Sequence, residues 1–138
     1  MKNAVFIIFF LISLTALSQR GKTGDQTFAY RFPKDVISEV STSMLVVTNE
    51  VEHDVIVLLR DQNKNYLRHA YIRKGARFTF RQLPLTRVFV QFKSLEFYFE
   101  QRERTNINFN EKHTFHFFYD ASQEGNYFKI TEEEFFKL

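Results

Sequence analysis

Arginine is the residue type in this sequence whose spacing most clearly suggests chemistry. Five arginines lie among aromatic and branched residues in the stretch YLRHAYIRKGARFTFRQLPLTRVFVQF, residues 66–92. A guanidinium group binds carboxylates in a planar, bidentate geometry, so arginines gathered on one surface suit an acidic partner. With one tyrosine from the next strand they form a candidate partner-binding face: Arg68, Arg73, Arg77, Arg81, Arg87 and Tyr98. In the alternative, which we favour, these arginines only form the solvated side of a β-sheet.

The segment NEVEHD, residues 49–54, is the best local candidate for binding a cation. It holds three carboxylates and a histidine, and without cysteine a zinc site would need such a set of ligands. His113 and His116 are three residues apart, which places them on opposite faces of a strand. We therefore expect a solvated turn at residues 49–54, and neither a metal nor a cofactor.

Motifs for nucleophilic catalysis and for phosphate binding are missing from the sequence. It has no cysteine, no Gly-x-Ser-x-Gly elbow, and four glycines that do not form a phosphate-binding loop. Glu96 and Glu100 are four strand residues apart, or about 13 Å, which is too far for the carboxylate pair of a glycosidase. We therefore predict that the protein is not an enzyme. A hydrolase with an unrecognised site is the alternative from another class.

Strands must position these residues, because most of the chain alternates between apolar and polar residues. The pattern predicts an all-β fold, a single antiparallel β-sandwich of about 7–8 strands. The predicted strands are residues 44–49, 54–60, 66–73, 77–81, 87–92, 94–101, 113–120 and 126–131, with a first edge strand at 28–33 as a further candidate. The strands at residues 113–120 and 126–131 are expected to pair as a hairpin. Thr131 and the three glutamates after it predict a short C-terminal helix.

The alternation also assigns side chains to the two faces of the sheets. The predicted core residues are Val55, Val57, Phe78, Phe80, Val90 and Phe97. Tyr98 lies on the opposite face from Phe97, so we expect it on the solvated side. A functional alternative joins Tyr98 with Tyr119 or Tyr127 in an aromatic platform for a sugar or a peptide.

The N-terminus predicts export. After one lysine comes an unbroken apolar run, residues 4–12, which tapers into the small residues ALS at 16–18. The run is shorter than the roughly 20 residues of a membrane-spanning helix, and the whole pattern is typical of a secretory signal peptide. We predict a signal peptide over residues 1–18, a flexible leader over 19–27 and one β-sandwich domain over 28–138. The mature protein would then have no membrane span and would lie in the periplasm or outside the cell.

The composition is that of a folded domain without disulfides. The net charge is only +3, and charged residues, which make up 25% of the chain, include both signs. This charge distribution is not that of a nucleic-acid-binding protein. The chain has 18 phenylalanines and no tryptophan, so the core must be built largely from phenylalanine rings. With no cysteine, the domain must be stable through packing alone.

The stretch DVIVLLRDQNKNYLRHAYIRKGARFTFRQLP, residues 54–84, resembles a group of small exported bacterial β-domain proteins of unassigned function. They share a polar hairpin turn, an RHAYI strand, a glycine turn, an FTF-like strand and a proline. More loosely, the pattern from Gly75 to Pro84 is similar to a signature of transthyretin-like and carboxypeptidase-regulatory-like β-sandwich domains. The glycine that those domains have two residues after the proline is replaced here by Thr86. The resemblance implies a sandwich fold and a binding or structural role.

Together, these patterns predict a non-enzymatic exported protein that serves as a binding or structural accessory. Its partner is expected to be an envelope protein or a polysaccharide, and not nucleic acid. Within binding, the main alternative is an inhibitor or immunity-type protein that holds an acidic partner on the arginine-rich face.

Overall fold

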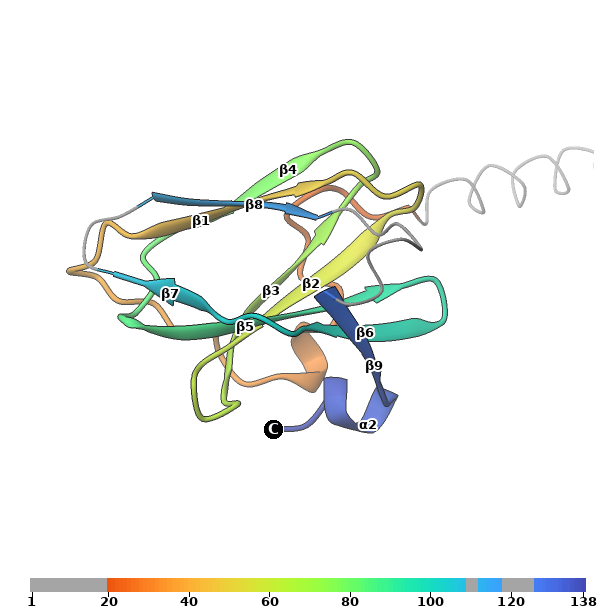
Figure 1. The fold of residues 1–138 in the computed structure, drawn as a ribbon. Helices are drawn as coiled ribbons and strands as arrows, with labels where there is room; N and C mark the ends of the chain where they lie inside the picture. Colours follow the sequence, from red (N-terminus) through yellow and green to blue (C-terminus); the bar gives the residue numbers. More distant parts are fainter. Residues whose placement is uncertain (1–19, 109–111, 118–125) are drawn as a thin grey trace, which may run out of the picture.

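The computed structural model describes residues 20–108, 112–117 and 126–138; the predicted signal peptide lies outside these ranges. Within them, nine strands form two facing layers (Figure 1), which confirms the predicted all-β sandwich. The strands are β1 (Met44–Asn49), β2 (Val55–Arg60), β3 (Tyr66–Ile72), β4 (Arg77–Phe80), β5 (Thr86–Ser94), β6 (Phe97–Gln101), β7 (Thr105–Ile107), β8 (Lys112–Phe117) and β9 (Tyr127–Ile130). A 3-10 turn, η1 (Ala29–Arg31), precedes them, and a short helix, α2 (Glu132–Phe135), follows.

The two sheets differ in size. One has the order β4-β1-β8, and the other has the order β3-β2-β5-β6-β9, with β7 also paired to β5. Neighbouring strands are antiparallel except β1 and β8, which run parallel. The predicted hairpin between residues 113–120 and 126–131 is therefore wrong, because β8 lies beside β1 in one sheet and β9 beside β6 in the other. Each of the two strands extends a different sheet, so both sheets gain backbone hydrogen bonds.

The main core lies between the sheets and follows the predicted alternation. Val55, Val57, Phe80 and Val90 are at most 1% exposed, which confirms four of the six predicted core residues. Phe78 is half-buried and packs against this core, with its ring centroid 5.0 Å from that of Phe80.

Phe97 contradicts the predicted core, because 51% of its surface is exposed. It is the first residue of β6, directly after the β5–β6 turn, so its ring lies at the end of the sandwich. Two residues further into the strand, Phe99 is buried and stacks on Phe92. The alternation assigned the correct face to Phe97, but it carries no information on how far the opposite sheet extends.

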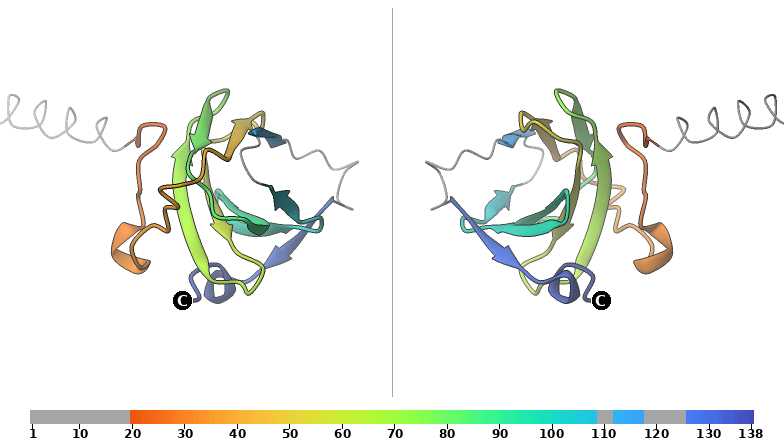
Figure 2. Two further views of the ribbon diagram at one scale, coloured as in Figure 1. Left: turned by 90° about the vertical axis from the view of Figure 1, so that its left-hand side faces the viewer. Right: turned by 90° about the vertical axis from the view of Figure 1, so that its right-hand side faces the viewer.

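A second apolar cluster covers the other face of the larger sheet. Its buried members are Phe32, Ile56, Leu58, Tyr66, Phe135 and Phe136. The N-terminal segment contributes Phe32, and α2 contributes Phe135. All six residues of β2 are buried as a result, as the nearly continuous apolar run of this strand predicts. Figure 2 shows the N-terminal segment, in orange, lying outside β3.

Residues 28–33 form η1 and the residues around it, so the candidate first strand there is wrong. The Arg31 N–H donates to the Phe28 carbonyl, and the Phe32 ring stacks on Tyr66 at 4.6 Å between centroids. Phe28 and Phe32 thus pack over the sheet face from a turn, whereas Tyr30 between them is exposed.

The predicted C-terminal helix is confirmed as α2. The Thr131 hydroxyl accepts a hydrogen bond from the Glu134 N–H, and the Glu134 carboxylate accepts one from the Thr131 N–H, which completes a capping box. Among the helices of the described residues, none has the length and apolar character needed to cross a membrane.

Candidate functional site

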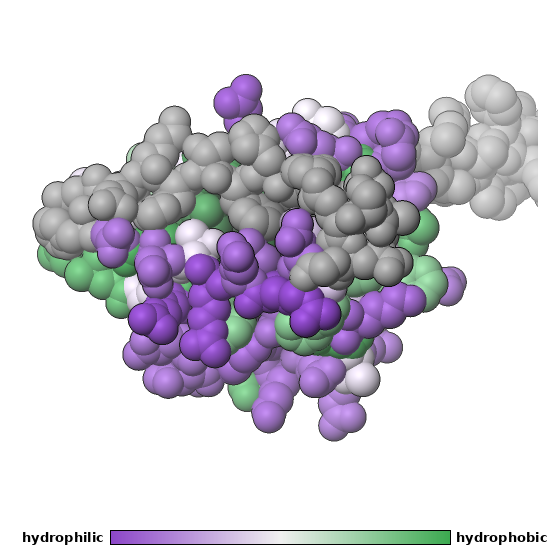
Figure 3. All heavy atoms as spheres, viewed as in Figure 1, coloured by the Kyte–Doolittle hydropathy of each residue, from purple (hydrophilic) through white to green (hydrophobic). Residues whose placement is uncertain are grey.

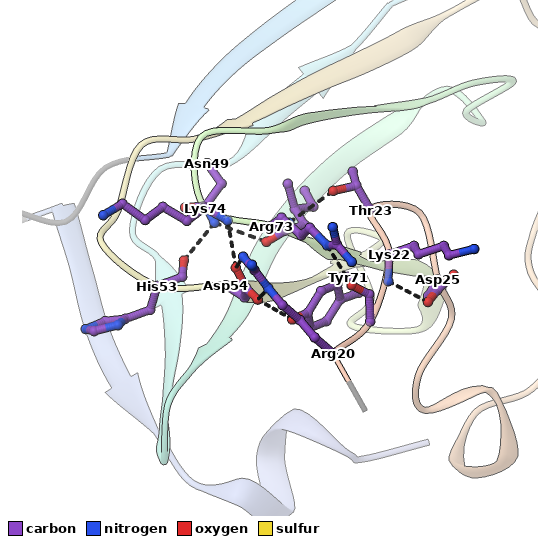
Figure 4. A network of polar contacts seen from close by, with 12 residues as sticks. Arg20, Lys22, Thr23, Asp25, Asn49, His53, Asp54, Tyr71, Arg73 and Lys74 are labelled. Carbon is purple, nitrogen blue, oxygen red and sulfur yellow. Dashed lines mark hydrogen bonds and ion pairs between the residues drawn. The ribbon is translucent and has the colours of Figure 1, made fainter. Parts of the chain in front are cut away.

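A network of polar contacts surrounds Asp54, immediately before β2 (Figure 4). The Arg20 guanidinium donates to both carboxylate oxygens of Asp54, with Nε–Oδ2 and Nη2–Oδ1 distances of 2.8 Å. The Tyr71 hydroxyl donates to Oδ2, and the Lys74 backbone N–H donates to Oδ1 at 2.8 Å. These donors, the Arg20 guanidinium above all, hold the pKa of Asp54 well below its usual range.

This network attaches a segment that we call the N-terminal strap, residues 20–37, to the edge strand β3. Backbone hydrogen bonds of 2.8 Å join Gly24 N–H to the Tyr71 carbonyl and Tyr71 N–H to the Asp25 carbonyl. Gly21 lies so close to the Tyr71 ring that an added Cβ would be 3.0 Å from Cδ1. Residues 20–27, which the sequence predicts to be a flexible leader, are thus docked on the sheet.

A hollow of about 450 Å³ opens beside Asp54; we call it the polar hollow. Glu52, His53, Lys74 and Lys93 line it together with the Arg20–Asp54 pair. The Lys74 ammonium lies 2.5 Å from a Glu52 carboxylate oxygen. In Figure 4 the His53 ring points away from Asp54. Among the described residues, no three His, Cys, Asp or Glu side chains gather closely enough to hold a metal ion. In the polar hollow, the carboxylates of Asp54 and Glu52 each face a cation.

An apolar pocket of about 270 Å³ adjoins the polar hollow at the end of the sandwich. The β1–β2 loop contributes Val51, and the β5–β6 hairpin contributes Phe92, Leu95, Phe97 and Phe99. β1 and β2 belong to different sheets, so the loop between them crosses the end of the sandwich. The tip of the β5–β6 hairpin lies to one side of this loop. The pocket and the hollow share three lining residues, Glu52, His53 and Leu95. We call the two together the end site.

The tip of the β5–β6 hairpin keeps two large apolar side chains in solvent. Leu95 is 56% exposed and Phe97 is 51% exposed. Leu95 has a φ of 54°, a left-handed conformation that is costly for a branched apolar residue. Figure 3 shows the apolar surface at the right-hand end, where Figure 1 places this hairpin tip.

The structure separates the arginines of the predicted binding face. Arg77 and Arg81 are exposed in and directly after β4, in the smaller sheet, whereas Arg87 is exposed in β5 of the larger sheet. Arg73 follows β3, is half-buried, and donates from Nε to the Gly21 carbonyl at 2.7 Å. They therefore do not share one sheet face.

Arg68 contradicts the prediction of a solvated arginine, because it is only 9% exposed. It lies opposite Leu59 in the β2–β3 pair, on the same side of β3 as the buried Ala70. Its Nε and Nη2 atoms are buried and have no hydrogen-bond partner among the described residues. Burial lowers the pKa of its guanidinium.

The aromatic platform around Tyr98 is not assembled with Tyr127. Tyr127 is buried in the core between the sheets, whereas Tyr98 packs against Phe135 of α2, on the opposite face, at 5.1 Å between centroids. Tyr98 is therefore half-buried under the helix and not on a solvated face. Tyr119, the other candidate partner, lies outside the described residues.

A second polar network, which the sequence did not reveal, lies under α2. The Arg60 guanidinium donates to Gln91 Oε1 at 3.0 Å and to the carbonyls of Phe135 and Lys137 at 2.7 and 2.6 Å. Gln91 donates in turn to the Glu100 carboxylate, which also pairs with the Lys64 ammonium at 2.5 Å. The network fixes α2 to the sheet. The sequence signal for this network was a single charged residue, Arg60, directly after the apolar run VIVLL.

The chain matches no protein-family model and no curated protein. The resemblance at residues 54–84 stays a prediction.

Proposed function

We propose that this chain is an exported accessory protein that binds an apolar group of a ligand at the end site without catalysing a reaction. The apolar pocket carries the proposal. Three phenylalanine rings and a leucine form a concave surface that is large enough for a small ligand, next to a hollow lined by polar groups. This combination of apolar walls and a few polar groups is typical of ligand sites.

The exposure at the hairpin tip supports the same proposal. Leu95 and Phe97 remain in water although the core lies only two residues away along β6. Burying an apolar side chain of this size stabilises a complex by about 1.5–3 kcal/mol. A ligand that covers both side chains would therefore gain much of its affinity there.

The polar groups of the end site support binding rather than catalysis. The carboxylate of Asp54 accepts hydrogen bonds from three residues, and its lowered pKa makes it a poor general base. The Lys74 ammonium likewise lowers the pKa of Glu52. A hydrolase at this site would have to break these contacts before either carboxylate could act.

A titration with octanol, a small neutral apolar probe, tests the proposal. Amide NMR shifts on addition of octanol are expected to change first at residues 50–53 and 92–99. Leu95→Asn removes the apolar side chain and suits the left-handed backbone, because asparagine tolerates that conformation. We expect this variant to weaken octanol binding about tenfold, which corresponds to about 1.4 kcal/mol.

Leu85→Asn is the matched control. Leu85 is 57% exposed, almost as much as Leu95, but it lines neither part of the end site. Octanol affinity should not change in this variant. Shifts that centre on the loop around Leu85, or equal losses in the two variants, would overturn the proposed function.

A further inference from the structure

We infer that the surface around the start of β5 binds an anionic lipid surface, with aliphatic side chains entering the bilayer interface and cations contacting lipid phosphates. This surface lies at the opposite end of β5 from the end site, because Leu85 directly precedes the strand and Leu95 directly follows it. The inference is therefore independent of the proposed function. It is carried by aliphatic side chains that the fold leaves in solvent next to exposed cations.

Four exposed aliphatic side chains form a surface that we call the aliphatic patch. The exposed fractions are 41% for Val36, 52% for Ile37, 57% for Leu85 and 82% for Val40. Figure 3 shows apolar surface at the left-hand end of the molecule, where Figure 1 places the start of β5 and the chain before β1. Single apolar residues on a surface need no explanation, whereas a group of them marks an interaction site.

Backbone hydrogen bonds hold the two segments of the aliphatic patch side by side. The Ser38 N–H donates to the Gln82 carbonyl at 3.0 Å, and the Leu83 N–H donates to the Ser43 carbonyl at 3.1 Å. The segment 36–43 thus runs along residues 82 and 83, directly before Leu85. The patch is a fixed feature of the fold and not the chance exposure of one loose loop.

Exposed cations border the aliphatic patch. We call three of them the basic rim: Lys34, Arg81 and Arg87. Each lies within two residues along the chain of a patch residue or of Gln82, which is bonded to the patch segment. Among the described residues, none of the three forms an ion pair. Glu39 is the only exposed acidic residue in the stretches 34–40 and 81–87, so positive charge dominates this surface.

The shape and composition of the aliphatic patch favour a lipid surface over a folded partner. Val40 lies near the tip of a turn that the Ser41 N–H closes by donating to the Ser38 carbonyl at 3.0 Å, so the patch is convex there. The cores of protein–protein interfaces are enriched in aromatic residues and methionine, and the patch contains neither. A bilayer interface accepts protruding aliphatic side chains, and its anionic headgroups attract the basic rim. A second copy of the chain would bring two basic rims together, and their like charges repel.

A label placed in the patch gives a local test, and it is specific because the sequence has no cysteine. The full chain carries Val40→Cys, or Leu95→Cys at the opposite end, with a dye whose emission shifts to the blue in apolar surroundings. Vesicles contain equal parts of phosphatidylglycerol and phosphatidylcholine, or phosphatidylcholine alone. The apolar run at residues 4–12 could itself bind a vesicle, so the signal must come from the patch. We expect a blue shift at residue 40 with the anionic vesicles, a far smaller one with phosphatidylcholine, and none at residue 95.

Charge variants measure the contribution of the basic rim. A cation close to an anionic membrane strengthens binding about fivefold. Replacing Lys34, Arg81 and Arg87 with glutamine should therefore weaken binding to the anionic vesicles about 100-fold at low salt. The difference from the parent should shrink in about 0.5 M salt, where screening is strong.

The matched control lowers the net charge by the same amount at exposed cations elsewhere on the chain. It replaces Lys22, Arg102 and Lys129 with glutamine. This variant should bind the anionic vesicles several-fold to tenfold more tightly than the basic-rim variant. Ile37→Ser with Leu85→Ser, which keeps every charge, should weaken binding about tenfold because less apolar surface enters the interface. All of these side chains are exposed, so the melting temperature should stay close to that of the parent.

Four results would overturn the inference. Equal losses in the basic-rim variant and its control would assign binding to the net charge alone. A blue shift at residue 95 without one at residue 40 would place the membrane at the other end of the sandwich. A shift at residue 40 with polyglutamate as large as with vesicles would indicate an acidic protein partner. A shift that appears when the protein alone is concentrated would indicate a second copy of the chain.

Discussion

The backbone N–H of Phe28 donates a hydrogen bond to Nε2 of His69, with an N···N distance of 3.1 Å. Nε2 is therefore the acceptor nitrogen of a neutral imidazole, and Nδ1 carries the proton toward the Tyr66 hydroxyl, 2.8 Å away. The Tyr66 hydroxyl in turn donates a hydrogen bond to Asp35 Oδ1 at 2.9 Å. One buried histidine thus joins β3 to two separate points of the N-terminal strap.

Protonation of His69 should loosen this attachment. Burial lowers the pKa of His69, although the negative charge of Asp35 opposes the shift. A histidine with a lowered pKa in the folded state contributes stability above its unfolded pKa of about 6.5, and this contribution is lost as the pH falls below that value. We therefore expect the melting temperature to fall between pH 6.5 and pH 5. The lowered pKa of Asp54 keeps that carboxylate ionised throughout this window.

His69→Gln is the control for this pH dependence. The glutamine oxygen can still accept the Phe28 N–H, but the side chain does not titrate. The variant should melt at nearly the same temperature at pH 6.5 and pH 5. A variant that loses stability over this range as steeply as the parent would assign the effect to other groups.

Gly21 should control the docking of the strap without controlling the fold. In Gly21→Ala the new methyl would meet the Tyr71 ring at 3.0 Å, closer than normal packing permits. We expect faster hydrogen exchange at the amides of Gly24 and Tyr71, which pair the strap with β3. Amides between β2 and β5 should exchange as in the parent. Unchanged exchange at Gly24 would show that the strap tolerates the methyl.

Phe80 tests the register of the main core. It is 1% exposed and lies opposite Leu45 in the β1–β4 pair. Phe80→Ala should lower the free energy of unfolding by about 3–5 kcal/mol, the usual range for removing a buried ring. Phe97→Ala removes the same ring from an exposed position and should cost far less. Chemical denaturation of both variants makes the comparison, and equal losses would contradict the strand register.

Arg77 and Arg81 should contribute little to stability, because both are exposed on β4 or directly after it. Changing both to glutamine should alter the free energy of unfolding by less than about 1 kcal/mol. A surface that binds an acidic partner would lose affinity in this variant, most clearly at low salt. A large loss of thermal stability would mean that these arginines have buried partners.

The strands and the C-terminal helix could be predicted because their signals are local. Alternation placed β1 to β6 within a few residues, and Thr131 with Glu134 indicated the helix cap. The polar residues 61–65 form the turn after β2, in which Lys64 takes a positive φ.

The parts that could not be predicted depend on contacts between distant segments. A bulge leaves Leu67 without a partner in β2, so Tyr66 joins His69 on one side of β3 instead of joining Arg68. The end site depends on where the β1–β2 loop crosses and on the left-handed backbone of Leu95. No local pattern of residues records either feature.

The two buried arginines, Arg60 and Arg68, should respond in opposite ways to replacement by methionine. They are 2% and 9% exposed, and burial lowers the pKa of both guanidinium groups. Arg60 donates to Gln91 and to three backbone carbonyls, which would lose their donor in Arg60→Met. A variant that leaves several buried acceptors unpaired should lose about 3–5 kcal/mol. Within the described ranges, two buried nitrogens of Arg68 have no partner, so Arg68→Met removes a desolvated charge and keeps most of the apolar side chain. Its stability should stay the same or rise by about 1–2 kcal/mol. Urea denaturation of both variants measures the difference, and a loss at Arg68 as large as that at Arg60 would mean that its guanidinium group is paired in solution.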